Sequence, residues 1–220
     1  MQVRTRHTPT FGVARLVLAP AEHVLLDQSS VLATSYGVGY EAKGNPALKI
    51  QAKGVRAALC TAGPEGGWVD VAPALPGDLH VLELDSAVGW CIAKAGWLAS
   101  AGMVSTDPTA PPLRALQGGD GGFLNFLMGS GSVVLACYGA LDVVTLEAGE
   151  LVTLGAGHVV GFPETLQCRL RATHPDAAQS VRTGEGLVFD FAGPGLVLTQ
   201  TRSPRQLVSW LRGNGLTARS

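Results

Sequence analysis

Two short sequence elements each occur three times in this chain at nearly constant spacing. The first is a glycine-rich turn element, whose copies begin 66 and 64 residues apart. The second is a three-residue apolar element, whose copies are 66 and 62 residues apart. The copies are Gly63-Pro64-Glu65-Gly66, Gly129-Ser130-Gly131 and Gly193-Pro194-Gly195 for the first, and Val31-Leu32-Ala33, Trp97-Leu98-Ala99 and Val159-Val160-Gly161 for the second. Such recurrence predicts a fold built from stacked copies of one unit.

The composition favours an all-β protein. Of the 220 residues 46% are hydrophobic and 15% are charged, and the chain has 29 glycines and 13 prolines. A charged fraction this far below the usual ~25% suggests that much of each strand is buried, with further apolar surface hidden between subunits. Apolar runs of four to eight residues bounded by glycine, proline, aspartate or serine predict strands rather than helices.

The strand pattern indicates which sheets are covered on both faces. Leu166 to Leu170 alternates apolar with polar, which is typical of a strand with one wet face, whereas Val133 to Cys137 does not alternate. The predicted strands lie near 12–18, 22–27, 47–52, 55–61, 67–72, 79–84, 89–94, 123–127, 131–137, 141–146, 150–154, 158–162, 165–171, 186–191 and 195–201.

We expect one compact β domain over residues 1–212. Its three repeats cover about 11–60, 61–127 and 128–192, followed by a return strand and a short helix at 193–212 and a frayed tail at 213–220. Ser203 can cap that helix and Pro204 suits its first turn. Leu207, Trp210 and Leu211 form one apolar stripe, which we expect to pack on the β core, with partner binding as the alternative.

Charge and cysteine usage limit the possible partners. The net charge of −1 lacks the basic excess of a nucleic-acid-binding protein. Cys60, Cys91, Cys137 and Cys168 form no CxxC pair and lie in apolar stretches, so we expect buried free thiols in a reducing, cytoplasmic compartment. The basic start of the chain resembles a targeting peptide only superficially, because Val13 to Leu18 is better interpreted as a strand. No continuous apolar helix is long enough to span a membrane.

No motif predicts catalysis, a cofactor or a metal. The GxGxxxG string at 155–161 is followed by a β-rich segment and a proline, so no helix can form there to hold a dinucleotide. His7, His23, His80, His158 and His174 contain no HxH pair. Neither a GxSxG elbow nor a phosphate loop is present.

Acidic and glycine residues in the turns are interpreted as structural. Glu22, Asp78 and Glu150 each occupy an acidic turn, and we expect them to cap backbone amides at equivalent positions of the three repeats. Trp68, Trp90 and Trp97 are expected in the core or at a subunit interface. The predicted structural turn residues are Gly77, Asp78, Gly129, Gly131, Gly149, Glu150, Gly157, Gly184, Gly186, Gly193 and Gly195.

Six motifs together resemble the altered-inheritance-of-mitochondria family over about Phe11 to Leu211. They are Pro76-Gly77-Asp78 with Leu82-Glu83-Leu84-Asp85, Gly129-Ser130-Gly131 with Tyr138-Gly139-Ala140, Gly157-His158-Val159-Val160, Gly184-Glu185-Gly186-Leu187, Gly193-Pro194-Gly195 and Gln200-Thr201-Arg202. Ala21 and the proline-rich 105–118 segment depart from the family pattern. The resemblance implies a double-stranded β-helix or β-sandwich related to the tryptophan RNA-binding attenuator subunit, present as tandem copies in a homotrimer that forms a ring. It supplies no catalytic residues.

The function predicted from these observations is that of a non-enzymatic, homo-oligomeric scaffold or assembly protein with an unknown protein partner. A β-barrel module that binds a small ligand or a metal, with or without enzymatic activity, is the alternative. An RNA-binding ring is less favoured because the charge is near neutral.

Overall fold

The computed structural model describes residues 1–41, 57–107, 123–173 and 186–216, and it is dominated by β-strands with one short α-helix at the C-terminal end. The strands are β1 (Gln2–Arg6), β2 (Val13–Leu18), β3 (His23–Asp27), β4 (Val31–Thr34), β5 (Gly39–Glu41), β6 (Ala57–Thr61), β7 (Gly67–Val71), β8 (Leu79–Asp85), β9 (Trp90–Ala93), β10 (Trp97–Ala101), β11 (Val104–Asp107), β12 (Leu124–Ala136), β13 (Leu141–Leu146), β14 (Leu151–Gly155), β15 (Val159–Pro163), β16 (Gln167–Ala172), β17 (Leu187–Ala192) and β18 (Gly195–Gln200).

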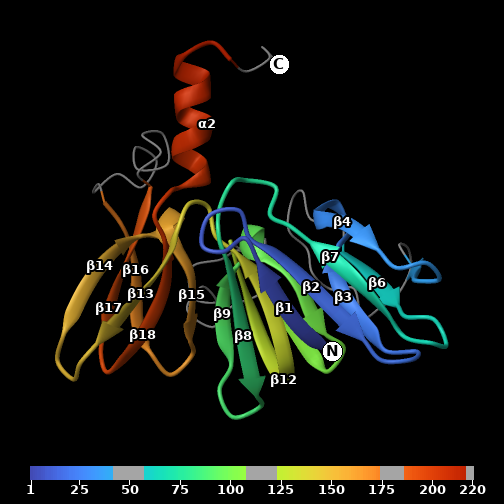
Figure 1. The fold of residues 1–220 in the computed structure, drawn as a ribbon. Coiled ribbons are helices and arrows are strands. Elements are labelled where there is room, and N and C mark those ends of the chain that lie inside the picture. Colours follow the sequence, from blue (N-terminus) through green and yellow to red (C-terminus); the bar gives the residue numbers. More distant parts are fainter. Residues whose placement is uncertain (42–56, 108–122, 174–185, 217–220) are drawn as a thin grey trace.

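The strands form four antiparallel sheets, which Figure 1 shows with the N-terminal strands on the right and the C-terminal strands on the left. Sheet 1 has the order β1-β2-β7-β4, and sheet 2 has the order β8-β12-β10-β3-β6-β5. Sheet 3 has the order β13-β18-β15-β9-β12-β11, and sheet 4 has the order β14-β17-β16. The long strand β12 joins sheets 2 and 3, because its second half pairs in sheet 2 and its first half in sheet 3.

A hydrophobic core lies between each pair of neighbouring sheets, which gives three cores among the described residues. The first packs Leu16 and Val69 of sheet 1 against Leu26 of sheet 2. The second fills the space between sheets 2 and 3, and the third places Phe162 of sheet 3 against Phe189 and Phe191 of sheet 4. Inner sheets must therefore be apolar on both faces. This explains the unbroken run in β12, where Val133 and Leu135 enter the second core and Val134 enters the first.

In the described parts of the chain, a strand, a single 3-10 turn and a second strand occur in succession three times. The turns are η1 (Gln28–Ser30) between β3 and β4, η2 (Lys94–Gly96) between β9 and β10, and η4 (Ala156–His158) between β14 and β15. Each time the chain passes from one sheet to the preceding sheet. The strand after the turn carries a register shift near its start, between Val31 and Ala33, Trp97 and Ala99, and Val159 and Gly161. These are the positions of the recurring apolar element.

The glycine-rich elements lie where the chain changes sheet, but only two of them are turns. Gly63 to Gly66 connects β6 to β7, and Gly193 to Gly195 connects β17 to β18. The predicted turn at 129–131 instead lies inside β12. Gly129 and Gly131 have φ angles of 122° and 125°, a backbone conformation that side chains disfavour, and they fall where β12 crosses from sheet 3 to sheet 2. Two predicted strands are therefore one continuous strand.

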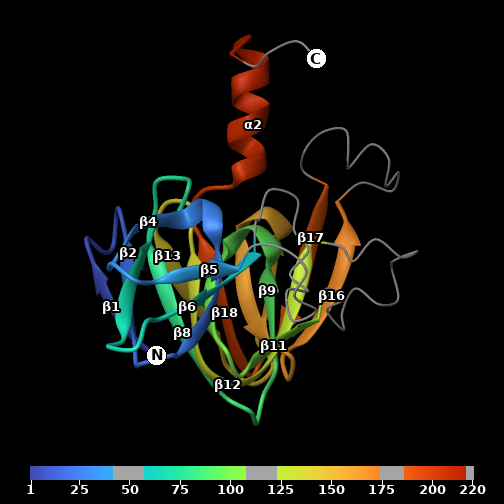
Figure 2. The same cartoon turned by 90° about the vertical axis from the view of Figure 1, so that its right-hand side faces the viewer.

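The prediction that the C-terminal helix packs on the core was wrong. Helix α2 (Pro204–Gly213) forms as expected, with Pro204 in its first turn, but the Ser203 side chain makes no capping hydrogen bond. Figures 1 and 2 show the helix rising away from the sheets. None of its residues is buried, and Trp210 is 59% exposed. The described sheets therefore leave the apolar stripe unburied, with Leu207 and Leu211 half-buried and Trp210 exposed.

The all-β prediction was confirmed, and most predicted strands lie within one or two residues of the observed ones. The ranges of β1, β4, β5, β10 and β11 were not among the predicted strands, and the strand expected near 47–52 lies outside the described residues. Among the described residues, no helix has the length and apolar character needed to cross a membrane.

Candidate functional site

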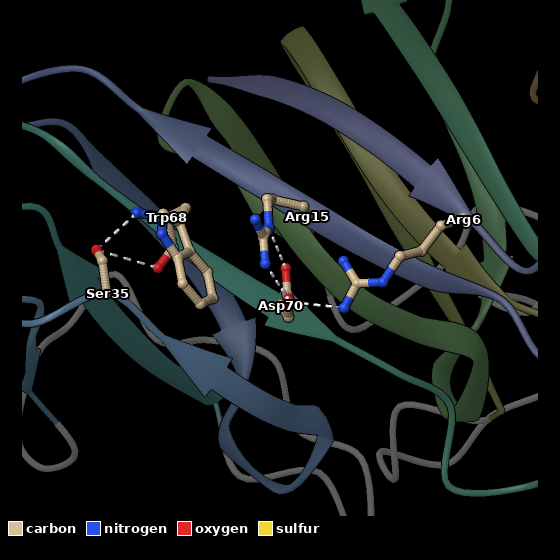
Figure 3. A network of polar contacts seen from close by, with 5 residues as sticks. All are labelled: Arg6, Arg15, Ser35, Trp68 and Asp70. Atoms are coloured by element: carbon tan, nitrogen blue, oxygen red, sulfur yellow. Dashed lines mark hydrogen bonds and ion pairs between the residues drawn. The ribbon is translucent and has the colours of Figure 1, made fainter.

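The outer face of sheet 1 carries a polar cluster formed by Arg6, Arg15, Trp68 and Asp70 (Figure 3). Arg15 on β2 lies opposite Asp70 on β7 in the strand register, so both side chains point to the outer face. Arg15 Nε and Nη2 donate to the two Asp70 carboxylate oxygens at 2.8 and 2.9 Å. Arg6 Nη2, from β1, donates to Asp70 Oδ2 at 2.7 Å.

The two guanidinium groups keep the Asp70 carboxylate ionised although its side chain is only 3% exposed. Hydrogen bonds from Arg15, and then from Arg6, outweigh the cost of desolvation and lower the pKa of Asp70 to about 2. The same contact raises the pKa of Arg15. Burial of an ionised carboxylate is tolerated here because its oxygens are bonded to charged donors.

The Arg15 guanidinium also contacts the aromatic ring of Trp68. The Arg15 guanidinium carbon lies 3.9 Å from the centroid of the Trp68 ring, within the range of a cation–π contact. The backbone of Trp68 is fixed by Ser35, because its N–H donates to Ser35 Oγ at 2.9 Å. With two arginines and one carboxylate, the cluster keeps one net positive charge, which suits contact with an acidic or polar surface.

A largely apolar cavity lies at the end of the sheets. Its volume is about 250 Å³, and it lies between η1, η2 and the segment that leads into α2. Apolar side chains, including Leu98 and Val160, line most of its wall, and Asp27, Ser30 and Gln200 supply polar groups. A cavity of this size holds only a small ligand.

A second, more open cavity of about 450 Å³ lies beside η4 and the start of α2. His158 lines it, and His158 Nδ1 donates to the Gln200 carbonyl oxygen at 2.9 Å. Among the described residues, no cluster of three or more histidine, cysteine or acidic side chains is arranged to hold a metal ion. The segment with His174 lies outside the described residues.

The acidic residues expected at equivalent turns do not occupy equivalent places. Glu22 and Glu150 match, since each side chain accepts the N–H of the residue three positions earlier, Ala19 at 2.8 Å and Glu147 at 2.6 Å. Asp78 instead precedes β8, where its Oδ1 accepts the N–H of Leu79. The connection between β8 and β9, which corresponds to the other two turns, is Ser86 to Gly89.

Gly77 allows the closest backbone approach among the predicted turn residues. A Cβ atom placed on Gly77 would lie 1.8 Å from the Cys137 carbonyl oxygen. Gly149 lies in the β13–β14 turn, Gly157 in η4, Gly186 directly before β17, and Gly193 and Gly195 at the β17–β18 connection, whereas Gly184 is outside the described residues.

The four cysteines are free, as predicted, and three of them are buried. Burial raises the pKa of Cys60 and Cys168 to about 11 and that of Cys91 and Cys137 to about 12. Such thiols are poor nucleophiles at neutral pH. Trp97 is fully buried in the second core, while Trp68 and Trp90 are partly exposed, so only Trp97 is a core residue in the strict sense.

Sequence reasoning missed the polar cluster on sheet 1. Arg15 and Asp70 each interrupt an apolar strand at an outward position, which marks the side chains as candidates for pairing. They are 55 residues apart, however, and only the register of β2 with β7 brings them together. Arg6 joins them through β1, a strand that the sequence pattern did not predict.

Comparisons with known proteins agree with this fold. A family model described as mitochondrial biogenesis AIM24 matches residues 3–202. An uncharacterized protein of Streptococcus pyogenes serotype M6 is 28% identical over 148 residues, which are 66% of this chain and 58% of that protein, so the match spans less than two thirds of the relative. The crystal structure of a Streptococcus pyogenes protein has the same fold, with a TM-score of 0.77 at 21% identity over 97% of this chain and 99% of that one. Because the family model covers nearly the whole sequence, the chain belongs to the mitochondrial biogenesis AIM24 family.

Proposed function

We propose that this protein is a non-enzymatic scaffold that works as a homo-oligomer of three copies arranged in a ring, in a reducing compartment such as the cytoplasm. Each chain would contribute three copies of one double-stranded β-helical unit, as in attenuator-like proteins. The unit corresponds to the recurring strand, 3-10 turn and strand, together with the strand pair that follows.

The observation that carries this proposal is the difference between inner and outer sheets. In the structure the chain divides into three thirds, β1–β7, β8–β12 and β13–β18. The inner sheets 2 and 3 each contain six strands, contributed by two successive thirds. Among the described residues, the outer sheets contain four and three strands, contributed by one third each. The stack thus ends on incomplete sheets, and an uncapped stack of repeats needs a cap or a further copy to cover its ends.

A structural role for the ionisable groups supports the absence of catalysis. Asp70 is held by two arginines, and Glu22 and Glu150 cap turns of their own chain. The cysteine thiols have raised pKa values. None of these side chains pairs a nucleophile with a neighbouring base, the arrangement that covalent catalysis requires.

Size-exclusion chromatography with light scattering tests the proposal. We expect a mass of three times 22.7 kDa at micromolar concentration. A mass of 22.7 kDa over the whole accessible concentration range contradicts it.

The 250 Å³ cavity favours the second candidate function, that of a small-ligand-binding module. A screen of small polar and apolar metabolites by thermal shift distinguishes the two candidates. A ligand that raises the melting temperature of the wild-type protein but not of a variant with Val160→Trp, which fills the cavity, supports ligand binding. RNA binding is the third candidate, and the arginines beside Trp68 are its best argument; filter binding at low salt tests it.

A further inference from the structure

The strands β4 and β14 each lack a neighbour that their counterparts possess. Strand β10 pairs with β12 and β3, and β15 pairs with β18 and β9. Among the described residues, β4 occupies the same place after its 3-10 turn but pairs only with β7. Likewise β3 and β9 each have two neighbours, whereas β14 pairs only with β17. Two edges are therefore open where the fold elsewhere forms a junction between successive thirds.

Burial at matched positions shows the effect of the missing neighbour. Leu32, Leu98 and Val160 each lie at the register shift near the start of the strand that follows a 3-10 turn. Leu98 is 4% and Val160 2% exposed, but Leu32 is 61% exposed. An apolar side chain that is buried at two of three equivalent places is expected to be covered at the third when the junction is complete.

The charge pattern singles out the same two edges. Strands at sheet edges usually carry charges that prevent pairing with other chains. Every other edge strand in the four sheets follows this rule, with charged residues in β1, β5, β8, β11, β13 and β16. The segments of β4 (VLAT) and β14 (LVTLG) contain none. Among the described edge strands, the sequence thus leaves without charges only β4 and β14, whose counterparts elsewhere in the fold have neighbours on both sides.

These edges cannot meet within one chain. Figure 1 shows β14 at one end of the stack and β4 at the other, with sheets 2 and 3 between them. We propose that β4 of one copy pairs antiparallel with β14 of a second copy of this chain, which reproduces the β10–β3 and β15–β9 junctions between molecules. This inference rests on the proposed homo-oligomer and specifies its contact.

The internal junctions fix the register of the proposed pair. The residue after the register shift lies opposite the residue two positions before the 3-10 turn, as Ala99 does with Leu26 and Gly161 with Ile92. By the same rule Ala33 lies opposite Leu154 of the next copy, and Thr34 lies opposite Thr153. The contact joins different surfaces of the two copies, so the copies assemble head to tail. Such an assembly closes as a ring when the rotation that relates neighbouring copies is a whole fraction of a turn.

Disulfide cross-linking tests the register. Thr34→Cys and Thr153→Cys are made in separate full-length chains, mixed at micromolar concentration and oxidised with copper phenanthroline. Directly opposite residues in antiparallel strands have Cβ atoms within reach of a disulfide. We expect a cross-linked dimer from the mixture, and no cross-link from either variant alone or from the wild-type protein with its four native cysteines. A dimer from one variant alone means that an edge pairs with itself, which overturns the proposal.

Substitution of Leu32 by a charged residue tests the same contact without cross-linking. Leu32→Lys places an ammonium in the junction, and we expect at least a tenfold weaker association by sedimentation equilibrium, with an unchanged circular dichroism spectrum. Val143→Lys is the matched control, because Val143 is 46% exposed on the edge strand β13, outside the junction. Equal association of the Leu32→Lys variant and the wild type overturns the contact.

The outcomes separate this inference from the function on which it rests. If light scattering shows an oligomer but neither the cross-link nor the effect of Leu32→Lys is found, the contact is wrong while the scaffold proposal stands. If the wild-type protein is monomeric, both are wrong.

Discussion

Replacement of Asp70 by asparagine should destabilise the protein in a pH-dependent way. The carboxylate binds Arg15 and Arg6, which lower its pKa from an ordinary 3.8 to about 2. At ~1.4 kcal/mol for each pKa unit, this shift corresponds to about 2.5 kcal/mol of stability. Because the Arg15 and Arg6 side chains are 37% and 38% exposed, solvent screening reduces the expected loss to about 1–2 kcal/mol.

The sign of the pH dependence follows from the lowered pKa. The folded state holds the proton less tightly than the unfolded state, so the contribution of Asp70 is fully present above pH ~5 and is lost as the pH falls towards 2. The free energy of unfolding, measured by urea denaturation, should therefore differ most between Asp70→Asn and wild type at pH 7. Roughly half of that difference should remain at pH 3.

The matched control is Asp190→Asn on the outer face of sheet 4. Arg171 Nε donates to Asp190 Oδ2 at 2.6 Å, but the Asp190 side chain is 34% and the Arg171 side chain 43% exposed. We expect a clearly smaller effect for this exposed pair. An Asp70→Asn variant that is as stable as wild type at pH 7, or a loss that is the same at pH 7 and pH 3, would refute the reasoning.

Three further predictions concern the interior. Gly77→Ala should destabilise by about 1–3 kcal/mol because its methyl group meets the Cys137 carbonyl oxygen, whereas Gly213→Ala, in open space, should not; equal melting temperatures would contradict this. Asn125→Leu should stabilise by about 1–3 kcal/mol, since neither amide atom of this fully buried side chain has a hydrogen-bond partner among the described residues; a lower melting temperature would show that the amide is satisfied in solution. A thiol reagent at pH 8 should label at most one cysteine, the partly exposed Cys168, until urea is added; rapid labelling of buried Cys91 or Cys137 would contradict the packing.

The sequence was sufficient for strand content and for the places where the chain changes sheet. Short apolar runs between glycines and prolines predict strands because the signal is local. The strand β1 was missed because Arg4 and Arg6 give it little apolar character. The continuous strand β12 was divided because a glycine-rich segment at 129–131 has the composition of a turn, while the structure uses it for a bend within a strand.

Long-range relations could not be obtained from sequence. The Arg15–Asp70 pair needs the register of β2 with β7, and the sharing of inner sheets needs the register of β3 with β10. The apolar stripe of α2 was visible in the sequence, but such a stripe only predicts which face of the helix is buried in a contact. It does not identify the covering surface, so the expected packing of Leu207, Trp210 and Leu211 on the core was wrong.

Amide hydrogen exchange of the two open edges tests the central claim most directly. At a concentration where the protein assembles, the amides of β4 and β14 should be protected as strongly as those of the internal strands β10 and β15. In the Leu32→Lys variant, or on dilution, the same amides should exchange rapidly while β10 and β15 stay protected. Fast exchange of β4 and β14 in the wild-type protein at every concentration would contradict the claim that a second copy continues the stack.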